Sequence, residues 1–374
     1  MGSRAVYALR FHADYRCQHS GACCTANWDV PVELPVYRSM SQAVSSGNLH
    51  TFTDVPSASP FILEPDLPEG AAAILERDEA GRCVFYAADA KRCIVHRDFG
   101  EAALPATCRH FPRVAVQDPR GVFISLSHYC PTAASMLFRD DDVEIVAEPR
   151  AFPEADYEGL VVTTDDLPPL LTPRMLMEFD GYTAWERHMV SRCSHVRRRP
   201  ASIVATLWRD AQRLGEWKPG VRSLLDAIAQ LPSDYVDVTE EAGLRTSLRR
   251  HGEVMAAVPD DLKPDPDEAG LDEAMHLYVA QEWTRFHAPV NRYLAAKAFA
   301  SWTAYQGRGI KTIVRGLDAA LALVRVEAAR QCRNASRALD RDLLLEAFRA
   351  SDFLLNHLAV GEDLARAWSA AEKE

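Results

Sequence analysis

The stretch from residue 15 to residue 24 reads YRCQHSGACC and places three cysteines within eight positions of a chain that has only nine. Four more cysteines follow before residue 131. Disulfides are rare in a reducing cytosol, whereas thiolates are the ligands that soft metal ions and iron-sulfur clusters prefer. The sequence therefore predicts a metal centre whose ligands come from seven cysteines: Cys17, Cys23, Cys24, Cys83, Cys93, Cys108 and Cys130.

Cysteine can also fill a core as a small apolar side chain, and free cysteine is among the most buried residue types. We expect this second interpretation to hold for one or two of the seven at most, because the rest of the chain is poor in cysteine. It is the preferred interpretation for Cys193 and Cys332, each of which stands alone in a stretch with helical patterning.

Length and composition are those of a globular protein with two domains. The chain has 374 residues, of which 48% are hydrophobic and 25% charged. The net charge of -11 argues against a general nucleic-acid binder, which needs clustered Lys and Arg to contact phosphates. There is no run of 18 apolar residues and no N-terminal signal-peptide pattern. We therefore expect a cytoplasmic protein with no membrane span and no nucleic-acid partner.

The patterning predicts an α+β protein, with a small hairpin-rich cysteine-cluster domain at 1–138 and an all-α helical domain at 173–374. Turn sequences at 78–81 and 118–121 lie between apolar runs and predict two hairpins, and Pro131 predicts the first turn of a helix. Residues 139–172, acidic and interrupted by prolines, predict a linker.

Two features refine this division. Within the linker, VEIVA at 143–147 and GLVVT at 159–163 have the composition of short strands. Beyond residue 173, apolar residues recur at spacings of three and four, which is the stripe that an amphipathic helix buries. Two such stripes are Trp283, Phe286, Val290 and Tyr293, and Ile313, Leu317, Leu321 and Val324.

The cysteines lie in motifs that follow one another in a recognisable order: FHADYRCQHSGACCTANWDVPVELPVY (11–37), RCVFY (82–86), RCIVH (92–96), GEAALPATCRHFPRV (100–114) and ISLSHYCPTAASML (124–137). This series resembles the family of zinc- or iron-chelating cysteine-cluster proteins named for a CxxCxxCC signature. Within that family it is most similar to the flagellin lysine-N-methylases. The shared features are a Cys-Cys pair followed by Trp28, Val30 and Val32, a segment from Gly100 and Glu101 to Thr107, Cys108, Arg109, Pro112 and Arg113, and Ser125 and Leu126 before Cys130 and Pro131.

The resemblance implies a zinc site or an iron-sulfur cluster and, for the methylases, transfer of a methyl group from S-adenosylmethionine to lysines of flagellin or a similar protein. The chain departs from the family pattern at one point. The second cysteine of the signature is missing, because His19, Ser20 and Gly21 stand between Cys17 and Cys23. An eighth ligand is therefore either absent or replaced by His19.

The residues themselves leave the metal open. Seven thiols can complete one four-cysteine site and leave three for a second. The compact CxxC pairs typical of structural zinc are lacking, so we favour an iron-sulfur cluster over zinc. Three histidines lie next to the cysteines as further candidates, although each is more often a neighbouring residue than a ligand: His96, His110 and His128.

The sequence singles out no catalytic residue. A glycine-rich dinucleotide turn and a compact CxxxCxxC loop are both missing. GRGIKT at 307–312 lacks the spacing of a phosphate loop and predicts a loop-to-helix transition. If S-adenosylmethionine binds, we expect a pocket between the two domains, with these candidates for its lining: Trp28, Asp29, Glu101, Phe111 and Tyr129. The alternatives to an enzyme are a non-catalytic metal-binding module and a zinc-stapled scaffold.

Overall fold

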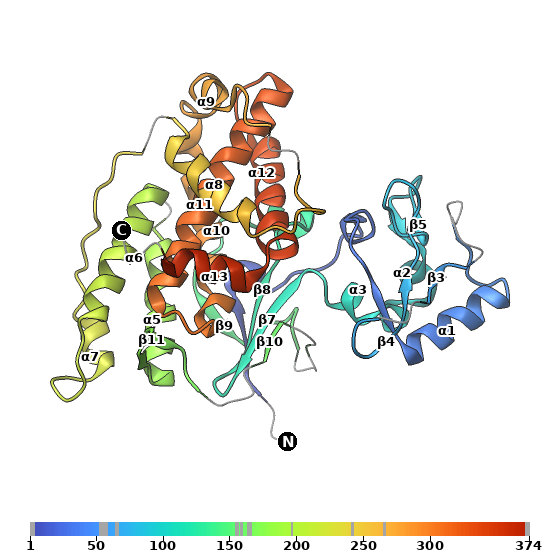
Figure 1. Cartoon of the computed structure of the whole chain (residues 1–374), viewed down its shortest axis with the longest axis horizontal. Helices are drawn as coiled ribbons and strands as arrows, with labels where there is room; N and C mark the ends of the chain where they lie inside the picture. Colours follow the sequence, from blue (N-terminus) through green and yellow to red (C-terminus); the bar gives the residue numbers. More distant parts are fainter. Residues whose placement is uncertain are drawn as a thin grey trace. The chain divides into compact units, whose positions relative to one another are not determined.

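The computed structural model describes residues 4–51, 59–63, 67–153, 157, 160–162, 167–195, 197–240, 243–264 and 267–370. The chain divides into two compact units, shown with the elements labelled in Figure 1. Residues 16–113 form one, which we call the cysteine unit. Residues 1–15 and 114–374 form the other, which we call the helical unit.

These boundaries differ from the expected 1–138, 139–172 and 173–374, and strand pairing is the reason. The N-terminal strand β1 (Val6–Leu9) pairs in parallel with β8 (Gly121–Leu126), so the first residues belong to the same sheet as residues after 114. The expected linker also supplies strands to this sheet, β9 (Ile145–Ala147) and β10 (Leu160–Val162), which confirms the two strand predictions.

The sheet of the helical unit has five strands in the order β10-β7-β8-β1-β9. β7 (Arg113–Asp118) neighbours β8, and the predicted turn at 118–121 connects them. β10 is parallel to β7, while β9 is antiparallel to β1. Every residue of β8 is buried, as expected for a central strand that is covered on both faces.

Helices make up most of the helical unit, as the apolar stripes predict. The 26-residue helix α11 (Ile310–Ala335) packs against α6, α8, α10 and α12, and all four residues of its predicted stripe are buried. The other stripe spans the turn η5 (Trp283–Phe286) and the helix α10 (His287–Ala298). The remaining elements are η1 (Arg10–His12), α4 (Pro131–Met136), β11 (Leu170–Thr172), β12 (Met175–Leu176), α5 (Phe179–Cys193), α6 (Pro200–Gly215), α7 (Leu224–Ala229), α8 (Arg245–Ala256), α9 (Leu271–Ala274), η4 (Met275–Val279), η6 (Trp302–Tyr305), α12 (Arg341–Phe353), η7 (Leu354–Leu358) and α13 (Gly361–Ala370).

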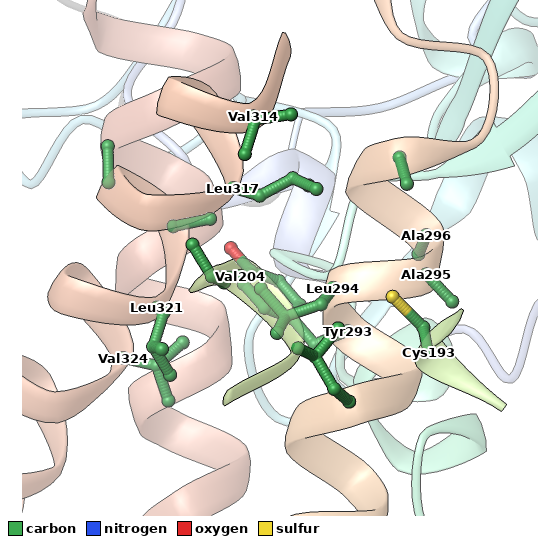
Figure 2. Close-up of a cluster of buried hydrophobic side chains, with 14 of the residues drawn as sticks. Cys193, Val204, Tyr293, Leu294, Ala295, Ala296, Val314, Leu317, Leu321 and Val324 are labelled. Atoms are coloured by element: carbon green, nitrogen blue, oxygen red, sulfur yellow. The ribbon is translucent and has the colours of Figure 1, made fainter. Parts of the chain in front are cut away.

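The two cysteines outside the N-terminal group are core residues of this bundle. Cys193, at the end of α5, and Cys332, in α11, are each fully buried. Figure 2 shows Cys193 beside Ala295 and Ala296 of α10. Burial raises the pKa of the Cys193 thiol to about 12. Both positions therefore fit the interpretation of cysteine as a small apolar residue.

The cysteine unit contains two small antiparallel sheets and three short helices. One sheet has the order β2-β4-β3, and the other is the pair β5-β6. The predicted turn at 78–81 closes on a single bridge between Arg77 and Cys83. The elements are η2 (Ala22–Cys24), β2 (Pro31–Glu33), α1 (Leu34–Ser45), β3 (Phe61–Ile62), β4 (Ala71–Leu75), β5 (Tyr86–Ala87), β6 (Arg92–Cys93), α2 (Ile94–Phe99), η3 (Glu101–Ala103) and α3 (Ala106–His110).

A separate apolar core holds this unit together. Val32, Ala73, Val84 and Phe85 are completely buried at its centre, and Cys83, Cys93 and Cys108 pack against its side. The whole chain is thus α+β, as predicted, with a helical C-terminal part. Among the helices described, none is both long and apolar enough to cross a membrane.

Candidate metal centre

Five of the seven predicted cysteines come together in the cysteine unit. Their thiols hydrogen-bond to one another or shift one another's ionisation through charge, although they come from four separate segments of the chain. We call these five residues the thiol cluster: Cys23, Cys24, Cys83, Cys93 and Cys108.

The backbone around β5 and β6 brings these segments together. The Cys83 N–H donates to the Cys24 carbonyl at 2.8 Å, and Cys93 is paired with Tyr86 across the two strands. The Tyr86 ring in turn lies against Gly21, where a Cβ would lie 2.4 Å from a ring carbon. Gly21 has a φ of +74°, so this position needs glycine for both space and backbone conformation. The turn η2 is thereby held beside the β5-β6 hairpin.

Cys24 is the hydrogen-bonding centre of the thiol cluster. Its side chain bonds to those of Cys23 and Cys93. The bond from Cys24 lowers the pKa of Cys93 to about 7 and also lowers the pKa of Cys23, while the pKa of Cys24 itself is strongly raised. This pattern is expected when Cys24 keeps its single proton and its two neighbours ionise more readily than ordinary thiols.

The two other members lie in less polar surroundings. Burial raises the pKa of Cys83 to about 12 and that of Cys108 well above its usual range. The charges of the neighbouring thiols add to both shifts. Ionising all five sulfurs together therefore needs a compensating positive charge, and a bound metal cation supplies such a charge.

The other two predicted cysteines lie outside the thiol cluster. Cys17 is exposed in the cysteine unit, and its sulfur accepts a hydrogen bond from the backbone N–H of His19 at 3.3 Å. Cys130 belongs to the helical unit, where its buried sulfur lies 3.7 Å from the hydroxyl oxygen of Tyr15. It directly precedes α4, with Pro131 at the first turn as predicted.

The candidate histidines separate in the same way. The rings of His19 and His96 lie 4.6 Å apart, and His96 follows Cys93 within the next helix. Burial, with the nearby charge of His19, lowers the pKa of His96. His110 ends α3, two residues after Cys108. His128 lies in the helical unit and is fully buried.

The donor set fits a soft metal in kind, because it offers several thiols, two of them with a lowered pKa, in a partly apolar setting. In the described part of the chain, however, no group of three or more His, Cys, Asp or Glu side chains is arranged so that it could hold a metal ion. The thiol of Cys24 is hydrogen-bonded to neighbouring sulfurs. Metal binding would replace these hydrogen bonds by metal-sulfur bonds and release protons.

The residues expected to line a cofactor pocket are divided between the two units. Trp28 and Phe111 contact each other in the cysteine unit, with ring centroids 5.4 Å apart, while Tyr129 packs on Phe353 in the helical unit at 4.8 Å. Asp29 pairs with Arg77. Glu101 lies in the first turn of η3.

A buried polar network in the helical unit is not predictable from the sequence. Asp352 is completely buried and accepts hydrogen bonds from the backbone N–H of His128 and, at 2.9 Å, from the Tyr293 hydroxyl. Lys297 forms an ion pair with the same carboxylate. His12 lies 3.2 Å from His128, nitrogen to nitrogen. These groups come from η1, the segment after β8, α10 and α12, and no sequence motif connects them.

Buried histidines make the helical unit sensitive to acid. Burial lowers the pKa of both His251 and His357 to about 4. Both are therefore neutral in the folded chain at pH 5 but protonated after unfolding, when the pKa returns to about 6.5. The unfolded chain binds more protons, so stability falls as the pH falls below about 6.5.

We expect the free energy of unfolding, measured by urea denaturation, to be lower at pH 5 than at pH 7 by roughly 2 kcal/mol for each of these two histidines. His251→Gln should reduce this difference in unfolding free energy between pH 7 and pH 5 by the contribution of one histidine. His276→Gln is the matched control, because the side chain of His276 is half exposed. An equal loss of stability at pH 5 in the wild type and in His251→Gln would contradict this assignment.

The chain was also compared with known proteins. No protein-family model, no curated protein and no solved structure matches it.

Proposed function

We propose that the cysteine unit binds a soft metal ion or an iron-sulfur cluster through the thiol cluster. The observation that carries this proposal is the convergence of five thiols from four segments of the chain, among which Cys24 hydrogen-bonds to Cys23 and Cys93. A cysteine that only fills a core is expected to be surrounded by apolar side chains and not by other thiols. Cys193 is such a residue, because it lies in the apolar core of the helical unit.

The balance of charge supports a cationic occupant. Burial raises the pKa of Cys83 and Cys108, and negative charge on the neighbouring cysteines would raise it further. A bound cation would reverse this effect and hold all five sulfurs ionised. The bound group would then also act as a cross-link between η2, the β5-β6 hairpin and α3.

An iron-sulfur cluster remains our preferred occupant, with zinc as the alternative. The ligand segments lack CxxC pairs, which are typical of structural zinc sites. Cys23 and Cys24 are adjacent in the sequence, so they can serve one centre together or two different ions. His19 and His96, which lie together beside Cys93, are the nitrogen ligands that we would add first.

The wider proposal is that the protein is a lysine methylase of flagellin or a similar protein substrate, with S-adenosylmethionine as methyl donor, acting in the cytoplasm. It is supported by the resemblance of the motifs, and the nine free thiols are compatible with a reducing compartment. A non-catalytic metal-binding module is the alternative. Methyl transfer needs a neutral lysine amine held in line with the sulfonium methyl, in a site that excludes water.

One preparation tests both proposals. We expect the full chain, purified without oxygen, to be brown and to bleach in air if it holds an iron-sulfur cluster, whereas a colourless protein that releases zinc would favour the scaffold. Calorimetric titration with S-adenosylmethionine should then give saturable binding at a Kd between about 1 μM and 1 mM, the range of ordinary enzyme substrates. A metal-loaded protein that does not bind S-adenosylmethionine would overturn the methylase proposal and leave the metal proposal intact.

A further inference from the structure

The helical unit contains a pocket of about 490 Å³ that the metal proposal does not use. Three elements form its walls: the C-terminal half of α6, the strand β11 with the residues after it, and the first residues of α11. Pockets that hold small organic ligands have volumes of about 300 to 1,000 Å³. This cavity is therefore large enough for a metabolite and not only for an ion.

The lining of this pocket is strongly basic. Four cationic side chains line it against one carboxylate, that of Glu216, and the four are Arg209, Arg213, Arg308 and Lys311. The chain as a whole has a net charge of -11, so a concentration of positive charge is the opposite of its average surface. Like charges brought together in a concave site repel one another unless an anion lies between them.

The cationic side chains of the pocket differ in whether they form ion pairs with carboxylates of the protein. Arg209 forms ion pairs with Asp210 and Asp234, at 3.0 and 3.1 Å. Within the described residues, neither Arg213 nor Arg308 forms an ion pair with a carboxylate. These two guanidinium groups stand on different elements, α6 and the loop before α11, and both line the same cavity.

The loop before α11 is built for a close approach to β11. Gly309 has a φ of +84°, and a Cβ at this position would lie 3.0 Å from the Leu171 carbonyl oxygen. Only glycine allows this contact without strain. It places Arg308 and the N-terminal end of the 26-residue helix at the pocket wall, where the helix dipole adds to the positive potential. The sequence GRGIKT thus does more than connect a loop to a helix.

We propose that this pocket binds a small organic phosphate. The planar guanidinium group of arginine forms bidentate hydrogen bonds with phosphate oxygens. A phosphate group carries a charge of about -1.5 to -2 at pH 7, which suits two arginines without carboxylate partners better than a single carboxylate does. Leu171 and Pro173 add apolar groups to the lining for the organic part of the ligand.

The test is calorimetric titration of the full chain with inorganic pyrophosphate, with citrate as a polycarboxylate control and a single-stranded oligonucleotide as a polyanion control. Arg308→Gln and Arg213→Gln should each weaken pyrophosphate binding by about tenfold or more, because each removes a charge-assisted contact. Arg187→Gln makes the same change of charge on α5, at an exposed position outside the pocket, and should leave the affinity within about twofold.

Each outcome decides the proposal. Binding that is lost in both pocket variants and kept in Arg187→Gln supports it, and circular dichroism spectra that match the wild type show that these variants are folded. The proposal is overturned if the wild type does not bind pyrophosphate at about 1 mM, a concentration that even a weak site with a Kd of this order would half fill. It is also overturned if citrate binds more tightly, if only the oligonucleotide binds, or if all three variants weaken binding equally.

Discussion

Replacing Asp352 with Asn should lower the free energy of unfolding by about 3 kcal/mol or more, the loss typical of breaking a buried ion pair by removing one partner. The carboxylate is completely buried, and its pKa is held well below the usual range by the charge of Lys297 and the hydrogen bond from His128, which outweigh burial. The amide cannot neutralise Lys297, which would be left as an unpaired cation with its side chain only 15% exposed.

The matched control is Glu346→Gln on the same helix. Glu346 pairs with Arg349, but its side chain is 47% exposed, so this substitution should cost less than about 1 kcal/mol. Denaturant titration of the two variants gives the comparison directly. Equal stabilities would show that water reaches Asp352 and that the network is not a buried one.

The second large effect is expected at Cys108. Its replacement by serine should remove both the bound metal and the stability that the metal gives to the cysteine unit, because ligand bonds form only in the folded chain. Structural zinc contributes about 10 to 16 kcal/mol of binding free energy in zinc-finger peptides, so the loss should be far larger than that of an ordinary core substitution. Cys108 lies in α3 and interacts with thiols from three other segments, so its loss disconnects that helix from the site.

Cys193→Ser separates the loss of metal from a general loss of stability. This substitution also puts a hydroxyl in place of a buried thiol, and it should destabilise the helical unit, but Cys193 lies among apolar residues of that unit, outside the thiol cluster. We expect it to keep the full metal content per folded chain. Retention of all metal by Cys108→Ser would remove Cys108 from the ligand set.

The elements with strong local signals could be predicted from the sequence. The spacing of Ile313, Leu317 and Leu321 indicates one buried helix face, and α11 buries all three. Turn residues at 118–121 likewise mark a connection between neighbouring strands. These predictions succeed because the signal and the structure lie within a few residues of each other.

The division into units could not be predicted, because it depends on a long-range pairing. Nothing local in VYAL shows that Val6–Leu9 pairs with β8, more than a hundred residues later. That pairing assigns Tyr15 and Cys130 to the helical unit, although the motif order groups Cys130 with the other cysteines.

Sites assembled from distant, individually ordinary residues were also beyond sequence analysis. Asp352 and Lys297 have no motif around them, and their importance follows only from burial in the folded chain. Arg213 and Arg308 are two among many arginines until α6 and α11 bring them to one pocket. Such sites are recognised by the burial of a charged side chain or by its ion pairing in the folded chain. Neither property can be read from the sequence.

X-ray absorption at the metal edge of the full chain, purified without oxygen, tests the central claim most directly. We predict a bound metal whose nearest neighbours are mainly sulfur, at about 2.3 Å, as thiolate ligation requires. A metal surrounded only by nitrogen and oxygen, or a folded chain that contains no metal at all, would contradict the account.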